Sequence, residues 1–400
     1  MTGSVPQIFG PDYRAWQRGR VVVGDRAFHV ATKPGLFAHG HEDPATQMLA
    51  AEVTECAGQR VVSMSCGNGL VGAVAAASGA SQVWMTDRNA LAIDASQRTL
   101  KANAVNGAVR MGHGAGPLPL DVMADVVAIR VVAERIPMLI LLHDALRILR
   151  PGGRCLLAGA NHEGAKSAAR LLERLFGNAK TLAQHRGHRL VVATRPAQPP
   201  DISDELITPF TDPHVFRDVP VSLRGRAFTL STRPGVFSWE HLDEATEVLA
   251  GLIDITPGER VLDIGCGAGA LGVVAAHLSH TGVVCLVDVD SEAVRCATQT
   301  LHAAGVANAR ALVSDVASAV RDESFDVVVA NPPFHVGTQV DLDVPRQFIR
   351  DAFDVLVPGG RVLLVANRTL PYEAMLSAQF GAYRSLYDGR RFKVLSARRA

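Results

Sequence analysis

The chain repeats its own sequence at a spacing of 200 residues. The repeat includes glycine, proline and aromatic motifs as well as single acidic and hydroxyl residues. The matching pairs are 24–28 with 225–228, 32–37 with 232–237, Asp43 with Asp243, Thr46 with Thr246, and Cys66-Gly67 with Cys266-Gly267. A tandem repeat of this length predicts two similar domains, each long enough to bury its own core.

A proline-rich segment separates the two copies. Residues 196–204 read Pro-Ala-Gln-Pro-Pro-Asp-Ile-Ser-Asp, which interrupts the apolar pattern. We therefore expect a first domain over 1–197, a linker over 198–205 and a second domain over 206–400. In each copy a segment ending in Gly-Leu-Phe or Gly-Val-Phe precedes the core, and we expect it to add a small strand-rich extension to the sheet.

A glycine-rich turn follows the first predicted core strand of the second copy. Val261–Ile264 is apolar except for Asp263, and Gly265–Gly269 then reads Gly-Cys-Gly-Ala-Gly before a helix predicted to begin near Ala270. Glycines there allow the backbone to approach a ligand closely. The same turn also satisfies the dinucleotide fingerprint in its alanine-ending form, so the turn alone leaves a nicotinamide enzyme open.

Polar residues at four predicted strand ends separate these interpretations. Asp263, Asp288, Asp315 and Asn331 each fall at the carboxyl end of a strand. A single such acid is often only a helix cap, but in a doubly wound sheet all four ends meet in one crevice where ligands bind. The set fits S-adenosylmethionine, with Asp288 on the ribose, Asp315 and Val316 on the adenine edge, and the glycine turn on the amino-acid end.

The motif Asn331-Pro332-Pro333-Phe334 indicates the chemistry. An exocyclic or amide nitrogen shares its lone pair with a π system and is a poor nucleophile until its N–H bonds are held. The Asn331 side-chain oxygen and the Pro332 carbonyl can accept those two hydrogens, two prolines stiffen the loop, and Phe334 offers a face for a flat base. The motif therefore predicts methyl transfer to a planar nitrogen by positioning rather than by a strong base.

Residues 225–393 resemble the bacterial ribosomal RNA guanine-N2 methyltransferases of the RsmC and RlmG type, which are class I S-adenosylmethionine-dependent enzymes. The resemblance rests on the glycine turn, on Asn331–His335, and on two more specific stretches, Val365–Tyr372 and Arg391–Val394. It implies an α/β fold of two tandem Rossmann-like domains, each with a seven-stranded, mostly parallel sheet. It also implies methyl transfer to N2 of a guanine in ribosomal RNA, in the small subunit rather than the large.

The resemblance and the motifs together give the expected site residues. S-adenosylmethionine is expected as methyl donor, and no metal is expected. The expected catalytic residues are Asn331, Pro332, Pro333 and Phe334. The expected cofactor-binding residues are Phe237, Asp263, Gly265, Cys266, Gly267, Ala268, Gly269, Asp288, Val289, Asp315, Val316 and Asn331.

The first copy departs from the second at the positions that carry this chemistry. Ser63 replaces Asp263, Ser65 replaces Gly265, and Arg130 stands where the second copy has Asn331, with both prolines gone. We expect the first domain to be degenerate: it keeps the fold but transfers no methyl group.

Charge suggests another use for the first copy. Residues 1–200 carry 22 Lys and Arg against 14 Asp and Glu, whereas 201–400 carry 18 against 25. Basic residues near its start and end, including Arg14, Arg18, Lys33, Arg174 and Lys180, suit phosphate contacts, so we expect RNA binding. The alternative is an ordinary solvated surface.

Other features bound the class of protein. The six cysteines and 14 histidines form no metal-binding spacing, the N-terminus has no signal segment, and no apolar run is long enough to span a membrane. We expect a cytoplasmic protein without membrane contact, whose partner is ribosomal RNA or a ribosomal subunit. We expect it to be a monomer in which the duplication mimics a dimer.

Two alternatives remain at this point. An enzyme with the same signature can act on the amine of adenine or cytosine or on a protein glutamine amide. A protein of another class, a noncatalytic RNA-binding or RNA-folding protein, could use both halves as platforms, although intact Asp263, Asp288 and Asn331 argue against it.

Overall fold

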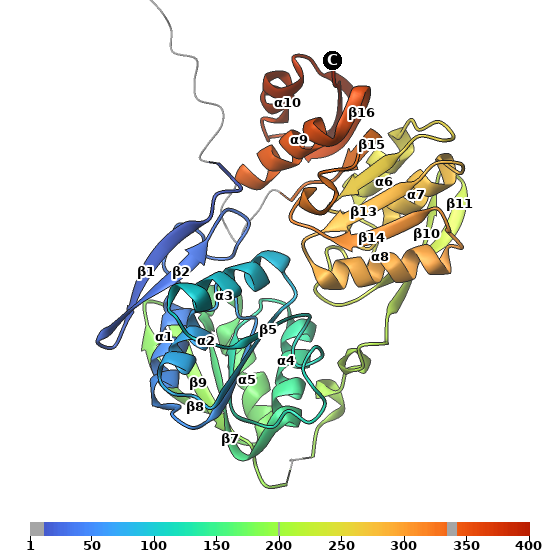
Figure 1. Ribbon diagram of the computed structural model, residues 1–400. Helices are drawn as coiled ribbons and strands as arrows, with labels where there is room; N and C mark the ends of the chain where they lie inside the picture. Colours follow the sequence, from blue (N-terminus) through green and yellow to red (C-terminus); the bar gives the residue numbers. More distant parts are fainter. Residues whose placement is uncertain (1–11, 199–200, 334–341) are drawn as a thin grey trace, which may run out of the picture. The chain divides into compact units, whose positions relative to one another are not determined.

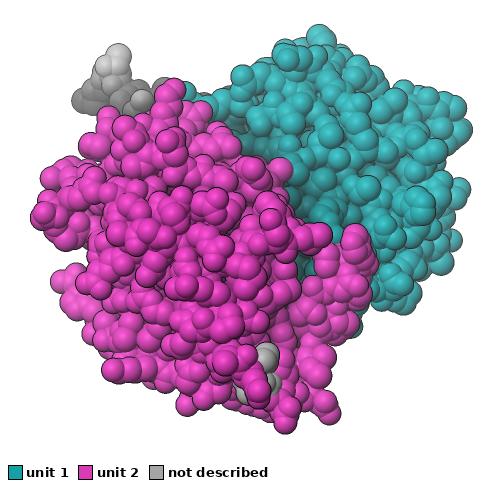
Figure 2. Space-filling model, turned by 60° about the horizontal axis from the view of Figure 1, so that its bottom comes forward, with its two compact units in different colours: residues 1–15, 216–400 teal, residues 16–215 magenta. Residues whose placement is uncertain are grey.

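The computed structural model describes residues 12–198, 201–333 and 342–400. The chain forms two compact units, coloured separately in Figure 2. The first covers residues 16–215, and the second covers 216–400 together with Asp12–Ala15. The division at 215/216 lies after the linker predicted at 198–205, and the short segment before Trp16 packs with the second unit rather than the first.

The first unit alternates strands and helices along the chain (Figure 1). Its elements are β1 Gln17–Val23, β2 Arg26–Thr32, α1 Pro44–Glu52, β3 Arg60–Met64, α2 Leu70–Ala77, β4 Gln82–Asp87, α3 Ala90–Ala102, β5 Ala108–Met111, β6 Ala124–Arg130, α4 Arg135–Ile148, β7 Leu149–Ala160, α5 Ala165–Phe176, β8 Lys180–His185 and β9 His188–Thr194.

The second unit repeats this order. Its elements are β10 Arg217–Leu223, β11 Arg226–Thr232, α6 Glu244–Leu252, β12 Val261–Ile264, α7 Ala270–Leu278, β13 Val284–Asp288, α8 Ser291–Ala303, β14 Ala309–Val313, β15 Phe325–Ala330, α9 Asp343–Val355, β16 Leu356–Asn367, α10 Tyr372–Phe380, β17 Arg384–Asp388 and β18 Phe392–Arg398.

Each unit contains a seven-stranded sheet with the same topology. The strand orders are β5-β4-β3-β6-β7-β9-β8 and β14-β13-β12-β15-β16-β18-β17, and only the pairings of β9 and β18 are antiparallel. The predicted fold of two tandem Rossmann-like domains is confirmed. The predicted extension of the sheet is wrong. Among the described residues, β1 pairs with β2 and β10 with β11, and each pair forms a separate two-stranded sheet.

Burial on both faces explains the composition of the central strands. All four residues of β12 are buried, as expected of a parallel strand covered by helices on each side. Leu262 and Ile264 pack into the core that includes residues of α9 and α10, whereas Val261 packs into the core that includes residues of α6 and α7. Within the described ranges, no helix has the length and apolar character needed to cross a membrane.

Candidate active site

Strand register brings the predicted residues of the second unit to one edge of the sheet. Ile264 at the end of β12 lies level with Val287 on β13 and with Ala330 on β15. The glycine turn, Asp288 and Asn331 therefore follow the ends of three neighbouring strands. This edge is the crevice in which open α/β sheets bind ligands.

The glycine turn requires glycine at several positions. Gly265, Gly267 and Gly269 have φ of 75°, 53° and 88°, in the left-handed region that favours glycine. A Cβ at Gly265 would also lie 3.1 Å from the ring of Phe348 on α9. The turn ends as predicted in a helix that begins at Ala270, so its backbone amides open onto the crevice.

Two residues within the turn face the protein rather than a ligand. The Cys266 thiol is buried, and burial raises its pKa well above the ordinary value, so the thiol is neutral. Ala268 packs against the small cluster around Val236, Ala293 and Cys296. That Cys266 and Ala268 bind the cofactor stays a prediction. It concerns the backbone atoms of these two residues and not their side chains.

Asp288 is held in a defined orientation at the end of β13. Its Oδ2 accepts a hydrogen bond from the Gly267 amide at 2.9 Å, and its Oδ1 accepts one from the Asp290 amide at 3.0 Å. The carboxylate is therefore fixed against the glycine turn while remaining only half-buried, with Val289 half-buried beside it. Such a fixed acceptor suits the two hydroxyls of a ribose.

Asp263 is the most unusual acid of the site. It is completely buried, and within the described residues neither carboxyl oxygen has a hydrogen-bond partner. Burial, together with the negative charge of Asp288, raises the pKa of Asp263 to about 8. An orphaned acid behind a glycine cradle fits a positively charged ligand, and S-adenosylmethionine carries positive charge at its sulfonium and its amino group.

Asp315 follows β14 and is reached by the N-terminal segment. The Tyr13 hydroxyl donates to Asp315 Oδ1 at 2.7 Å, and Tyr13 is itself buried in the core of the second unit. Val316 adopts a φ of 52°, unusual for a β-branched residue, and is buried. Next to it, Ala317 donates its amide to Asp351 at 3.1 Å, and Asp351 forms an ion pair with Arg14.

Two residues at the start of α6 accept hydrogen bonds from the Asn331 side chain. Its Nδ2 donates to Asp243 Oδ2 and to Thr246 Oγ1, both at 3.0 Å. Only the NH₂ side of the amide can donate to a carboxylate, so this pairing fixes which way the side chain points. The Asn331 carbonyl oxygen is consequently turned away from Asp243 and is oriented as an acceptor, as the methyl-transfer chemistry requires.

The rest of the predicted loop is described in part. Pro332 is buried and Pro333 exposed. Phe334 lies outside the described residues, so its predicted stacking role stays a prediction. Phe237, predicted at the cofactor entrance, is 67% exposed.

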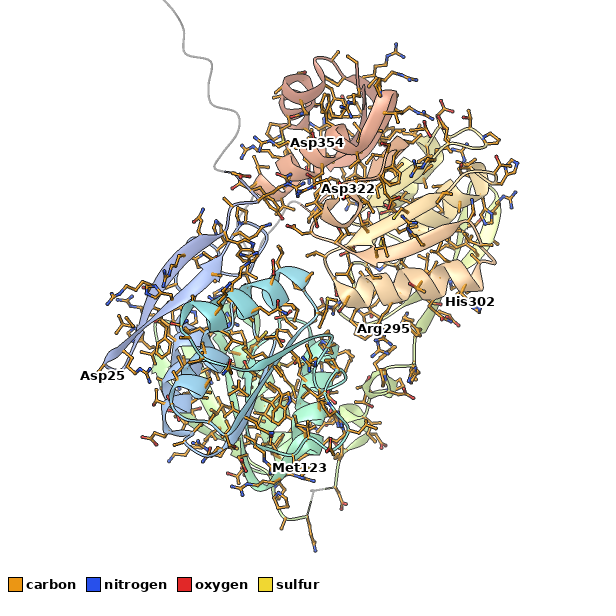
Figure 3. All side chains as sticks on the ribbon, in the orientation of Figure 1. Asp25, Met123, Arg295, His302, Asp322 and Asp354 are labelled. Carbon is orange, nitrogen blue, oxygen red and sulfur yellow. The ribbon has the colours of Figure 1, made fainter. Side chains whose placement is uncertain are left out.

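The loop that carries Phe237 is anchored to α8 by a buried ion pair. Arg233 Nε lies 3.0 Å from Glu292 Oε2, and Arg295, labelled on α8 in Figure 3, lies 2.7 Å from Glu292 Oε1. Both guanidinium groups also lie within 6 Å of the Phe216 ring centroid, at 5.8 and 5.7 Å. The two cations and Glu292 therefore hold the Gly235–Phe237 turn beside the crevice.

In the first unit, Arg130 occupies the position that Asn331 occupies in the second. Its Nε lies 2.8 Å from Asp43 and its Nη2 lies 2.7 Å from Glu163. Asp43 also caps α1, as Asp243 caps α6, so the same anchor holds an arginine in one copy and an asparagine in the other. The Arg130 guanidinium stacks 4.8 Å from the ring centroid of Phe37, the counterpart of Phe237.

The first unit keeps part of the cofactor cradle. Asp87 accepts the Gly67 amide at 3.0 Å, as Asp288 accepts that of Gly267. Ser63, however, provides no acid in place of Asp263, and Ser65 adopts a φ of 53° where the second unit has glycine. The turn geometry has survived, but the buried carboxyl group and the asparagine have not.

Sequence reasoning missed three contacts of the site. The contacts of Asp243 and Thr246 with Asn331 were not predicted, although an Asp-x-x-Thr cap retained in both copies was a usable signal. Nothing in the sequence indicated that Tyr13 reaches Asp315. Among the described residues, no group of three or more His, Cys, Asp or Glu could hold a metal ion.

Comparison with known proteins gives the family. Residues 27–192 and 227–396 each match the methyltransferase small domain. The ribosomal RNA small subunit methyltransferase C of Hahella chejuensis is 34% identical over 281 residues, which is 70% of this chain and 79% of the relative. That of Chromohalobacter salexigens is 44% identical over 174 residues, 42% of this chain and 51% of the relative.

A solved structure resembles the chain over nearly its whole length. It is the T. thermophilus 16S rRNA N2 G1207 methyltransferase (RsmC) in complex with AdoMet and guanosine. The match has a TM-score of 0.79 at 27% identity and covers 97% of this chain and 99% of that one. The chain therefore belongs to the methyltransferase small domain family and, within it, to the RsmC type of class I S-adenosylmethionine-dependent ribosomal RNA methyltransferase.

Proposed function

We propose that the second unit transfers a methyl group from S-adenosylmethionine to the exocyclic N2 amine of a guanine in 16S ribosomal RNA. The relatives support the substrate, because one is described as an N2 methyltransferase of 16S rRNA bound to guanosine. The observation that carries the mechanism is the orientation of Asn331, whose amide hydrogens are consumed by Asp243 and Thr246. Its carbonyl oxygen is left to accept a hydrogen from the substrate amine.

Catalysis in this site is a matter of orientation. Bound S-adenosylmethionine supplies an electrophilic methyl group on a sulfonium. Asn331 Oδ1 and the Pro332 carbonyl would accept hydrogen bonds from the two N–H groups of the amine, which turns the nitrogen lone pair toward the methyl donor. The N–CH3 bond forms as the S–CH3 bond breaks, the neutral thioether leaves, and the methylated amine loses one proton to solvent. The Asp288 carboxylate holds the ribose, Asp315 with Val316 the adenine edge, and the Gly265–Gly269 backbone the amino-acid end.

A guanine within a helix must leave its stack to reach Asn331. Unstacking costs a few kcal/mol, which contacts elsewhere on the RNA have to offset. We assign part of those contacts to the first unit, whose sequence is basic. Arg18, Arg20 and Lys180 are exposed and available for phosphates. Lys33 is not, because it is 3% exposed and lies 5.7 Å from the ring centroid of Trp16.

The remaining expectations complete the proposal. The protein acts as a monomer, in which the closed first unit takes the place of a partner subunit. It works in the cytoplasm, where bacterial ribosomal RNA is made and assembled. Its partner is naked 16S rRNA or a small-subunit assembly intermediate.

The test is to identify the labelled nucleoside. The protein is incubated with methyl-labelled S-adenosylmethionine and either naked 16S rRNA or 30S subunits that lack the modification, with 23S rRNA as the matched control. Mass spectrometry of the digested RNA is expected to find the label in N2-methylguanosine from 16S rRNA alone. Label in N6-methyladenosine, N4-methylcytidine or added protein would replace the substrate, and no label in any of them would overturn the proposal.

A further inference from the structure

The edge strand of the catalytic sheet has an unusual surface. β17 is the outermost strand, and residues 381–388 are all exposed, including all of β17. Among them Tyr387 and Leu386 are each 41% exposed, and Tyr383 is 40% exposed. Edge strands of soluble proteins usually carry charged side chains that prevent association with other molecules. Exposed aromatic side chains on such a strand therefore indicate a binding surface.

The turn after β17 lies at the catalytic end of the sheet. β18 runs antiparallel to β16, with Phe392 opposite Asn367, and β16 runs parallel to β15, which ends just before Asn331. The Gly389–Arg391 turn therefore shares the edge on which Asn331 lies. Three strand spacings, about 14 Å, separate β15 from β17 across the sheet.

A bulge places Arg384 and Tyr387 on one face. Arg384 pairs with Ser396 and Tyr387 with Val394, two residues apart on β18, and the register shifts between Ser385 and Tyr387. Because alternate residues of a strand share a face, Arg384 and Tyr387 point the same way. That face is the one covered further in by α6, because Val394 lies in the core that includes Ala245 and Leu249.

The same face connects directly to the active site. Arg391 forms an ion pair with Glu244, the first residue of α6. Glu244 is adjacent to Asp243, which accepts the hydrogen bond of Asn331 Nδ2. The hairpin turn thus contacts the residue next to Asp243 at the start of α6.

The charge of the hairpin is suited to a polyanion. Within the described part of the chain, Arg384 and Arg390 have no ion-pair partner, and the nearby acid Asp388 is paired with Arg368 at 3.3 Å. The Tyr387 ring lies so close over Gly389 that any Cβ there would collide with it, so the ring rests on the turn backbone as a platform. Aromatic platforms flanked by arginine are how proteins hold single-stranded nucleic acid without reading its sequence.

The first unit provides an internal comparison. Lys180 on β8 pairs with Val192 on β9, just as Arg384 on β17 pairs with Ser396 on β18. The register of both edge strands shifts at the same place, two residues before Ala183 in β8 and two residues before Tyr387 in β17. At the position of Tyr387 the first unit has Ala183, and at that of Tyr383 it has Ala179. The basic residue is common to both edges, whereas the aromatic ones occur only on the edge of the unit that carries Asn331.

We propose that β17 and its turn bind the single-stranded RNA next to the target guanine once it has left its stack, with Tyr387 stacked on a neighbouring base and Arg384 and Arg390 on phosphates. The inference rests on the proposed function, because it takes RNA as the substrate. It assigns to the catalytic unit itself the contacts that hold the flipped strand. The first unit then contributes sequence-independent affinity further along the RNA.

The experiment compares full-length variants with naked 16S rRNA as substrate. Tyr387→Ala, which places the first unit's own residue at this position, is expected to raise the KM for RNA about tenfold while leaving kcat and the Kd of S-adenosylmethionine unchanged. Tyr387→Phe is expected to restore the KM, because stacking needs only the ring. Tyr383→Ala is the matched control, since Tyr383 is equally exposed but lies before β17 begins.

Salt dependence tests the arginines separately. The double change Arg384→Ala with Arg390→Ala is expected to lower the slope of log KM against log salt by about 1.4, since each phosphate contact on a single strand contributes about 0.7. A KM for Tyr387→Ala within twofold of wild type, or an equal rise for Tyr383→Ala, overturns the assigned surface while the wild type still methylates RNA. No methylation of any RNA by the wild type instead overturns the proposed function, and this inference with it.

Discussion

At the residue scale, Asn331 depends on a carboxylate that also caps a helix. Asp243 Oδ2 accepts the Thr246 amide at 2.8 Å and the Asn331 Nδ2 at 3.0 Å. One residue therefore starts α6 and sets the direction of the Asn331 amide. The first unit keeps this arrangement with Asp43 and Thr46 but holds Arg130 instead.

Replacing the anchor separates its two duties. Asparagine caps helices about as well as aspartate, so Asp243→Asn is expected to leave α6 intact. It removes the charge that draws the Asn331 amide hydrogens, so kcat is expected to fall about tenfold, with the Kd of S-adenosylmethionine unchanged. Asp43→Asn in the first unit is the matched control: it is expected to lower the melting temperature but not kcat. Equal kcat losses in both variants would count against the anchoring role.

Asp263 predicts a pH dependence of stability. Its pKa of about 8 in the folded protein lies above the ordinary value of 3.8, so the folded state holds a proton that the unfolded state has lost. Stability from this group is therefore complete below pH 3.8 and is lost as pH rises toward and through 8. The melting temperature of Asp263→Asn minus that of wild type is therefore expected to increase from pH 5 to 8. Above pH 8 this difference is expected to stay constant. Parallel melting curves of the two proteins across this range would contradict the buried, orphaned acid.

Some features of the site residues could be predicted from the sequence and others could not. Asn331, Asp288 and the glycines were predictable because each belongs to a short local pattern with a chemical purpose. Whether Asp263 has partners was not predictable, because it depends on what packs around it. Lys33 was misassigned to the RNA surface for the same reason, since a lysine near a chain terminus is usually exposed and this one is buried against Trp16.

At the element scale, the segment Asp12–Ala15, before β1, belongs to the second unit. Tyr13 and Arg14 bond to Asp315 and Asp351, which bracket the turn after β14. Arg14 and the Ala317 amide partly offset the burial that raises the pKa of Asp351. The segment therefore fixes the turn proposed to hold the adenine.

Removing the Tyr13 hydroxyl should loosen this turn. Tyr13→Phe deletes a hydrogen bond to a carboxylate and is expected to raise the Kd of S-adenosylmethionine several-fold with little change in kcat. Tyr372→Phe is the control, because Tyr372 lies in the same core but its hydroxyl has no hydrogen-bond partner within the described residues. Calorimetric titration measures both, and an unchanged Kd for Tyr13→Phe would show that the segment does not support the cofactor site.

The order of strands and helices could be predicted from the sequence. Which strands pair and which distant residues make contact could be predicted only in part. Hydrophobic runs ending in glycine or acid identified the core strands because parallel strands are buried on both faces. The β10–β11 hairpin was placed on the main sheet because the sequence does not say which edge a strand pairs with. Tyr13 and Asp315 are 302 residues apart, and no local pattern links them.

At the scale of the whole molecule, two copies of one fold differ at the crevice beside their central strands. The first copy keeps the sheet topology and the Asp87 contact but lacks the buried acid and fills its amide position with Arg130. The duplication was legible from sequence because the copies still match at a constant spacing. The ion pairs of Arg130 were not, because Asp43 and Glu163 lie far from it along the chain.

This asymmetry predicts one bound cofactor per chain. Calorimetric titration of the full-length protein with S-adenosylmethionine is expected to give one equivalent, and Asp288→Ala is expected to abolish it, whereas Asp87→Ala leaves it unchanged. The physical reason is that the Ser63 hydroxyl cannot replace the buried carboxyl group of Asp263, which can ionise beside a positively charged ligand. Two equivalents, or loss of binding on changing Asp87, would show that the first crevice is still a cofactor site.

The central claim is that Asn331 orients a guanine amine, and one comparison tests it. Label transferred to 16S rRNA and the Kd of S-adenosylmethionine are measured for wild type and for Asn331→Ala in the full chain. The account predicts that transfer falls by about 10²-fold or more, while the Kd stays within a few-fold. Unchanged turnover in the Asn331→Ala protein would contradict it.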